Sequence, residues 1–136
     1  MLHRVMMTGL LWVAYLLGAI VFAAVIITGY KQYQLQDEAD FIAETQGKYG
    51  GYTTVAHEHL LEFTRDRNFD ISKMEVEVSA PDEPVPWGTP VSTTIRYQHQ
   101  VKVGNLITPF YVELIGEGWD VSRYVEGKYA VTYMSP

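Results

Sequence analysis

The feature that most constrains this chain is a stretch without formal charge, residues 5–29, close to the N-terminus. About twenty consecutive apolar residues are enough to span the hydrocarbon core of a bilayer. A secretory signal has a shorter apolar core followed by a cleavage site between small residues, whereas this stretch runs without a break into the polar residues 30–34. The sequence therefore predicts a retained helix that crosses a membrane.

Charge is distributed unevenly on the two sides of this stretch. All sixteen Asp and Glu and nine of the ten Lys and Arg lie after residue 30, which gives this part of the chain a net charge of −7. Arg4, with His3 and the amino terminus, forms the only positive cluster before the span and favours an N-terminus inside the cell. The acidic charge argues against nucleic acid as a partner, and the absence of cysteine excludes disulfide bonds.

The membrane-length helix is predicted to continue as a soluble helix. Residues 31–46 contain neither Pro nor Gly and consist mostly of good helix formers. Their apolar stripe, flanked by the acidic residues 37, 38, 40 and 44, consists of Leu35, Ala39, Ile42 and Ala43. We expect two parts: a long helix, residues 1–46, with an apolar half, 5–29, and an amphipathic half, 30–46, and then a small globular head, residues 47–136.

The head is predicted to be a small α+β fold. Gly47, Gly50 and Gly51 are expected to end the first helix, because glycine tolerates the left-handed conformation common at helix ends. Thr53 or Thr54 can cap a short second helix that reaches about Arg65. The second helix is expected to cover a small antiparallel sheet.

Alternation of apolar and polar residues predicts the strands of this sheet. The first comprises residues 74–78, and a proline-rich loop, 81–90, separates it from the longest alternating run, 91–103. The apolar stretch 106–115 is of unclear type. Residues 127–134 are predicted to form a closing strand.

The histidines give little indication of a metal site. His57 and His59 flank Glu58, but residues 60 and 61 are leucines, so the helical zinc motif His-Glu-x-x-His is not present. Neighbouring helical residues point about 100° apart, so we interpret His57 as solvated and His59 as half-buried. His99 falls on the apolar face of the long strand, where a partly buried histidine is expected.

One segment is a calcium candidate, because it copies ligand positions 1, 3, 5 and 12 of a helix–loop–helix calcium loop. The candidate ligands are Asp66, Asn68, Asp70 and Glu77. Ile71 occupies the turn position that requires glycine, so a polar helix-to-strand turn is the alternative interpretation. Since the sequence contains no nucleophile, phosphate-binding or dinucleotide motif, we expect neither enzymatic activity nor a cofactor.

Small residues in the apolar stretch suggest close helix packing. Ala14 and Gly18 lie one turn apart, as do Ala19 and Ala23, and such pairs let helices approach one another. The predicted assembly interface is Leu10, Ala14, Leu17, Gly18, Val21, Phe22 and Val25.

The order of these features resembles the type IV pilin superfamily, and specifically the TadE-type pilin-like proteins of tight-adherence systems and their Gram-positive relatives. The resemblance is one of architecture and covers nearly the whole chain: the two-part helix, the glycine-bearing segment 44–51, and the stretches 74–78, 91–103, 106–115 and 127–134. Prepilins usually carry a Glu five residues after the leader-cleavage site. Here that position is Ala14 if Gly9 precedes the cut, and Val5 if Met1 is the mature start.

The resemblance implies a structural subunit of an extracellular, type IV pilus-like filament. In that family the apolar helix is held in the cytoplasmic membrane before assembly and in the filament core afterwards, with the heads outside. The implied partners are copies of the same chain, the membrane, and the pilus or secretion assembly machinery. Two alternatives stay open: a minor pseudopilin or single-pass accessory subunit, and a membrane-anchored binding module that uses the 81–90 loop with Trp87.

Overall fold

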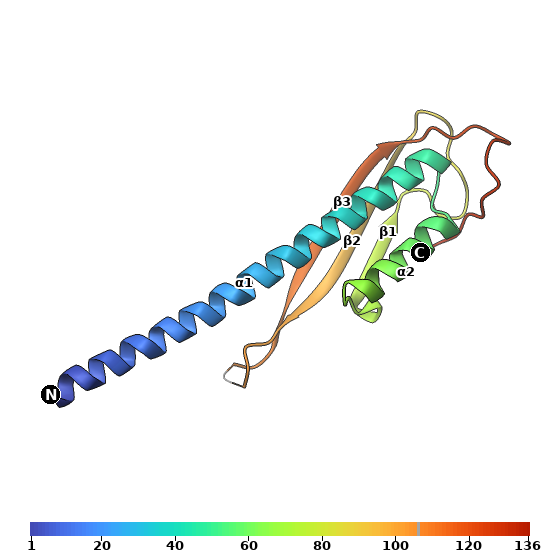
Figure 1. Ribbon diagram of the computed structural model, residues 1–136. Coiled ribbons are helices and arrows are strands. Elements are labelled where there is room, and N and C mark those ends of the chain that lie inside the picture. Colours follow the sequence, from blue (N-terminus) through green and yellow to red (C-terminus); the bar gives the residue numbers. More distant parts are fainter. Residues whose placement is uncertain (106) are drawn as a thin grey trace.

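The computed structural model describes residues 1–105 and 107–136 and confirms the predicted α+β fold (Figure 1). A long helix and a short helix precede a three-stranded sheet. The elements are α1 (Leu2–Tyr49), α2 (Thr54–Asp66), the 3₁₀ turn η1 (Ile71–Lys73), β1 (Met74–Val78), β2 (Pro90–Val101) and β3 (Phe110–Val121). The C-terminal half of α1 lies along the sheet, and its N-terminal half projects beyond it (Figure 1).

Helix α1 ends three residues later than the sequence predicted. It continues through Gly47 to Tyr49, and Gly50 ends it in the left-handed conformation with φ 80°. Gly47 lies inside the helix, and the side chain of Asp120 occupies the place where a Cβ atom at position 47 would project. The glycine at position 47 therefore serves close packing, and only Gly50 serves termination.

The sheet is antiparallel with the order β1-β2-β3. Strand β1 has the predicted bounds, and β2 covers most of the predicted run 91–103. Of the stretch 106–115, whose type the sequence left open, residues 110–115 form the first half of β3. Leu106, in the same stretch, lies outside the described residues.

The predicted closing strand at residues 127–134 is wrong. This segment makes only an isolated bridge, between Tyr133 and Thr53, and does not extend the sheet. It lies instead across the junction of the two helices, where the Tyr133 hydroxyl donates a hydrogen bond to the Tyr49 carbonyl oxygen at 2.6 Å. Its backbone pairs with the connection between the helices, where the Thr54 N–H donates to the Thr132 carbonyl oxygen at 3.0 Å and the Met134 N–H donates to the Tyr52 carbonyl oxygen at 3.1 Å.

The amphipathic half of α1 packs on the sheet as predicted. Leu35, Ala39, Ile42 and Ala43 are all fully buried. Two glycines of β3 face them: a Cβ atom on Gly116 would lie 2.6 Å from the Leu35 carbonyl oxygen, and one on Gly118 would collide with the Ala39 carbonyl oxygen. The helix backbone therefore lies directly on the strand backbone.

Two glutamines of α1 cover the free edge of β3. The Gln32 side-chain amide donates to the Ile115 carbonyl oxygen at 2.6 Å. Gln36 makes a two-way contact with Glu117, donating to its carbonyl oxygen at 2.6 Å and accepting from its backbone N–H at 3.1 Å. These contacts satisfy backbone groups that an edge strand would otherwise expose to pairing with other chains.

Helix α2 is capped at its N-terminus and is tied to α1 at its C-terminal end. Thr53 caps its N-terminus by accepting a hydrogen bond from the Ala56 backbone N–H. At the other end, the Lys31 ammonium group of α1 donates to the carbonyl oxygens of Arg67 and Asn68, at 3.3 and 3.2 Å, and lies 4.2 Å from the ring centroid of Phe69. A cation at a helix C-terminus also complements the helix dipole.

Candidate functional site

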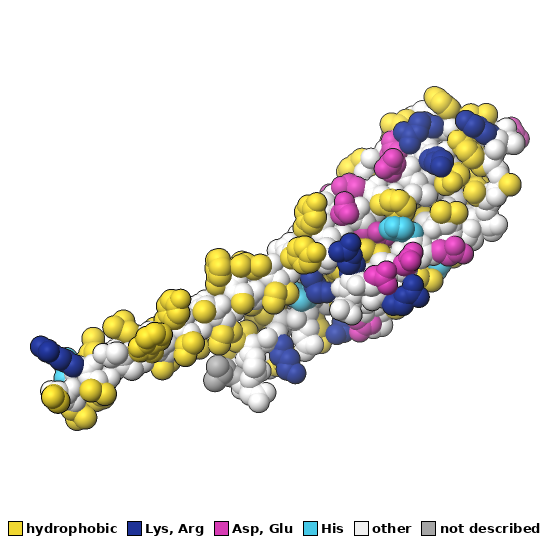
Figure 2. Space-filling view, viewed as in Figure 1, with side chains coloured by type: hydrophobic (Ala, Val, Ile, Leu, Met, Phe, Trp, Pro, Cys, Tyr) yellow, Lys and Arg dark blue, Asp and Glu magenta, His cyan; other side chains and the backbone are white. Residues whose placement is uncertain are grey.

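The first candidate site is the projecting half of α1. Residues 1–20 are all exposed, and α1 is the one helix of the described residues that is long and apolar enough to cross a membrane. Its surface is almost continuously hydrophobic, while the acidic and basic side chains gather on the head (Figure 2). A helix with this surface is unstable in water unless lipid or protein covers it.

The seven residues of the predicted assembly interface all lie exposed on this half. Leu10, Phe22 and Val25 are 63%, 67% and 63% exposed, and a Cβ atom added at Gly18 would meet no atom within 4 Å. The small side chain of Ala14 lies one turn before Gly18, so this part of the helix is flat enough for a close approach by another helix. The assembly interface stays a prediction.

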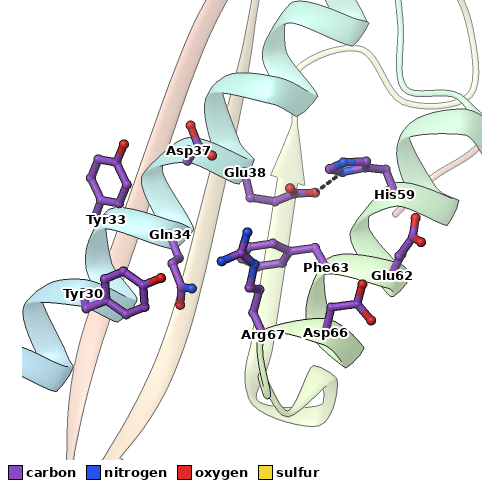
Figure 3. A pocket seen from close by; sticks show the side chains of 10 residues that line it. All are labelled: Tyr30, Tyr33, Gln34, Asp37, Glu38, His59, Glu62, Phe63, Asp66 and Arg67. Carbon is purple, nitrogen blue, oxygen red and sulfur yellow. Dashed lines mark hydrogen bonds and ion pairs between the residues drawn. The ribbon is translucent and has the colours of Figure 1, made fainter.

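The second candidate site is a polar cleft between α1 and α2, with a volume of about 290 Å³ (Figure 3). Glu38 of α1 and His59 of α2 point toward one another across it (Figure 3). The lining residues are Tyr30, Tyr33, Gln34, Asp37, Glu38, His59, Glu62, Phe63, Asp66 and Arg67.

A carboxylate–imidazole pair joins the two helices in this cleft. The Glu38 Oε1 atom lies 3.0 Å from the His59 Nδ1 atom, and the Glu38 side chain is only 3% exposed. The ring of Phe41 stacks on the His59 ring with 3.9 Å between centroids. Sequence analysis placed Glu38 among the acidic residues that flank the apolar stripe. Helix α2 covers that flank of α1 and buries the Glu38 side chain.

Burial changes the acidity of this site. Removal from water raises the pKa of Glu38 to about 7; the hydrogen bond and charge of His59 oppose this shift, and the charge of Asp37 adds to it. Burial also raises the pKa of Tyr52, and the charge of Glu38 raises it further. The protonation of Glu38 therefore changes near neutral pH, in a contact that holds two helices together.

The other histidines are separate from this pair. His57 is partly buried, not solvated as predicted, because its Nδ1 atom lies 3.1 Å from the Tyr52 hydroxyl. His99 is partly buried on the inner face of β2, as predicted, and both burial and the charge of Lys31 lower its pKa. His57 and His59 therefore contact different partners and do not converge.

The four residues of the calcium candidate do not converge either. Asp66 ends α2, and Asn68 has a positive φ of 55° in the turn that follows. An Asp70 carboxylate oxygen accepts hydrogen bonds from the backbone and hydroxyl of Ser72, at 3.0 and 2.6 Å, and thereby caps η1.

Glu77, at the twelfth position of the calcium motif, pairs with Arg96 at 3.1 Å on the outer face of the sheet. Within the part of the chain that the structure describes, no three His, Cys, Asp or Glu side chains are grouped so that they could hold a metal ion. The spacing of the motif is therefore accounted for by a helix-to-strand turn.

Comparison with known proteins adds no relative. No family model matches the chain significantly, and neither a curated protein nor a solved structure does. The features of the described residues that bear on function are the exposed N-terminal half of α1, the head that holds it, and the cleft.

Proposed function

We propose that this chain is a membrane-anchored structural subunit that assembles with copies of itself into an extracellular, type IV pilus-like filament. One observation carries the proposal: a single helix of 48 residues has its C-terminal part buried in its own head, while residues 1–20 are exposed throughout. Such a subunit presents the long apolar half of α1, residues 5–29, to its surroundings. We call this part the shaft, and the buried part of α1 keeps it in a fixed orientation relative to the head.

The surface of the shaft suits bundling with identical shafts. In lipid, helices associate through close packing and small residues, because apolar side chains gain little by leaving lipid for protein. Ala14 and Gly18 provide such a surface between the larger side chains Leu10, Leu17 and Val21. In the bundle, the apolar halves form the core of the filament and the acidic heads form its outer surface.

The charges near the N-terminus supply the orientation of the subunit. Arg4, with His3 and the amino terminus, forms the positive cluster before the span, so we place the N-terminus inside the cell and the acidic head outside. The subunit then resides in the cytoplasmic membrane until assembly machinery transfers it to the filament. On transfer, each shaft exchanges contacts with lipid for contacts with neighbouring shafts. The packing of the shafts and the contacts between heads therefore decide whether the filament or the membrane is favoured.

The proposal is tested by electron microscopy of material sheared from the surface of cells that express the chain, with mass spectrometry of the dominant subunit. Thin filaments composed chiefly of this chain are the expected result. A chain that stays in the membrane fraction while no filament contains it contradicts the proposal. That outcome favours a minor or accessory subunit of a pilus or secretion machine, or a binding module presented by the anchor.

A pair of variants at one position makes the test specific. Gly18→Asp places a charge in the middle of the shaft and is expected to abolish assembly while the head still folds, because an unpaired buried charge is costly in lipid and in protein. Gly18→Ala adds only a methyl group and is expected to assemble. Normal filament yield from Gly18→Asp contradicts the role of the shaft as the filament core.

A further inference from the structure

An apolar groove of about 630 Å³ separates α1 from the end of the β2–β3 hairpin. Val21 and Val25 line it on the side of α1, and Val103, Ile107 and Phe110 line it on the side of the hairpin. The hairpin runs back along α1 toward the N-terminal half of the helix (Figure 1). The groove is therefore continuous with the exposed apolar surface of the shaft.

The contacts between α1 and β3 show how far along α1, toward its N-terminus, the hairpin reaches. Leu35 lies against Gly116 and Ala39 against Gly118, so four residues of helix correspond to two residues of strand. The two steps are nearly equal in length, about 6 Å and about 7 Å. Continued to the start of β3, this correspondence places Phe110 level with about residue 23 of α1. Ala24 and Thr28, which are partly buried in an otherwise exposed segment, lie on the side of the helix that faces the hairpin.

This level is the boundary of a membrane that α1 spans. The uncharged stretch 5–29 is about 37 Å long as a helix, whereas the hydrocarbon core is about 30 Å thick. The last turns of the stretch, near residues 25–29, therefore lie where acyl chains meet headgroups. A hairpin that reaches residue 23 enters this boundary by several ångströms.

The composition of the hairpin end is suited to contact with lipid at the surface of the membrane that faces the head. Sequence positions 84–112 contain no acidic residue, and Lys102 is the only charged residue in 101–112. Ile107 and Phe110 are 54% and 49% exposed at the end of a loop. A lysine beside apolar side chains can extend its ammonium group to lipid phosphates while the side chains enter the acyl region.

Exposed aromatic side chains lie at this boundary and just beyond it on the side of the head. Tyr30 and Tyr33 on α1 are 56% and 67% exposed, and Tyr111 on β3 is 54% exposed. Tyrosine is enriched where a membrane meets water, because its ring is apolar and its hydroxyl group is polar. The backbone groups of the hairpin turn must stay within reach of water. The turn can therefore enter the membrane as far as the boundary but not as far as the bilayer centre.

We propose that the end of the β2–β3 hairpin, residues 101–105 and 107–112, is a second membrane contact, which enters the lipid boundary beside α1 while acyl chains fill the groove. Together with α1, this contact holds the head to the membrane at two points and so fixes the tilt of the head. The inference rests on the membrane-anchored state of the proposed function and does not depend on filament formation.

Because the chain contains no cysteine, single cysteines can be introduced and spin-labelled in the full chain. Ile107→Cys probes the hairpin end, and Thr108→Cys repeats the measurement at a neighbouring exposed position. Val13→Cys probes the shaft, and Trp87→Cys is the matched control, since Trp87 is 65% exposed in the loop at the other end of the sheet. The labelled chains are placed in vesicles of phosphatidylcholine and phosphatidylglycerol, and collision with oxygen, which enters lipid, is compared with collision with a water-soluble nickel chelate.

The expected oxygen-to-nickel ratio is severalfold higher at positions 107 and 108 than at 87, and highest at 13. A ratio at 107 and 108 equal to that at 87, with position 13 in lipid, overturns the inference and leaves the membrane anchor intact. Nickel access at 13 overturns both proposals. Spectral broadening at 107 that disappears on dilution with unlabelled chain also overturns the inference, because a second copy, and not lipid, then occupies the groove.

Discussion

The buried carboxyl group of Glu38 makes the stability of the head depend on pH in an unusual direction. Burial raises its pKa from an ordinary 4.5 to about 7, so the folded head binds this proton more tightly than the unfolded chain does. The stabilisation is fully present below pH 4.5 and is lost as the pH rises through 7. The difference between the two pKa values corresponds to about 3 kcal/mol, since one pKa unit is about 1.4 kcal/mol.

The variant Glu38→Gln isolates this effect, because glutamine has nearly the same shape and does not titrate. Between pH 4 and pH 8, we expect the free energy of unfolding of the wild type to fall by about 3 kcal/mol relative to that of the variant. The measurement is urea unfolding of the full chain in detergent micelles, followed by near-ultraviolet circular dichroism. The remaining groups near the pair, including Asp37, His59 and Tyr52, are common to both proteins.

The matched control is Glu58→Gln, which removes an exposed carboxyl group from α2. We expect this variant to follow the pH dependence of the wild type. Equal pH dependence in the wild type and Glu38→Gln would refute the reasoning, because it would show that the contact between Glu38 and His59 balances the cost of burial.

Three further changes test how α1 is held. Gly118→Ala is expected to lower the free energy of unfolding by about 1–3 kcal/mol, because the added methyl group collides with the backbone of α1; in the same urea titration, Gly29→Ala, in open space, should not destabilise. Gln36→Ala removes both hydrogen bonds to Glu117 and is expected to cost about 1–2 kcal/mol and to speed aggregation, measured by light scattering. Lys31→Met frees the C-terminal end of α2 and should accelerate amide exchange there; unchanged exchange would show that the contact is dispensable.

Periodicity was enough to predict the elements that bury one regular face. The stripe that begins at Leu35 is fully buried on the sheet, Thr53 caps α2, and β1 has the predicted bounds. In each case local propensity and the pattern of apolar residues indicate the same structure, which is the condition under which sequence patterns are reliable.

The elements that sequence analysis missed depend on contacts between distant segments. Gly116 and Gly118 interrupt the apolar alternation of β3, so the strand is hard to recognise until the helix backbone is seen to fill their places. Residues 127–134 alternate as a strand would, but Tyr133 and its neighbours pack on helix ends. Glu38 follows Leu35 by three positions, and this spacing alone was a signal that it shares the buried side of α1.

The glycine contacts also determine how the shaft is coupled to the head. Leu35 and Ala39 rest on Gly116 and Gly118, and the glutamines at 32 and 36 bond to residues 115 and 117, so every turn of helix is matched to two residues of strand. Sliding the helix by one turn would set the side chain of Leu114 or Asp120 against its backbone and break the glutamine contacts. The register is therefore unique, and the apolar half leaves the head in one direction. In a membrane or in a filament, the position of the shaft then fixes the orientation of the head.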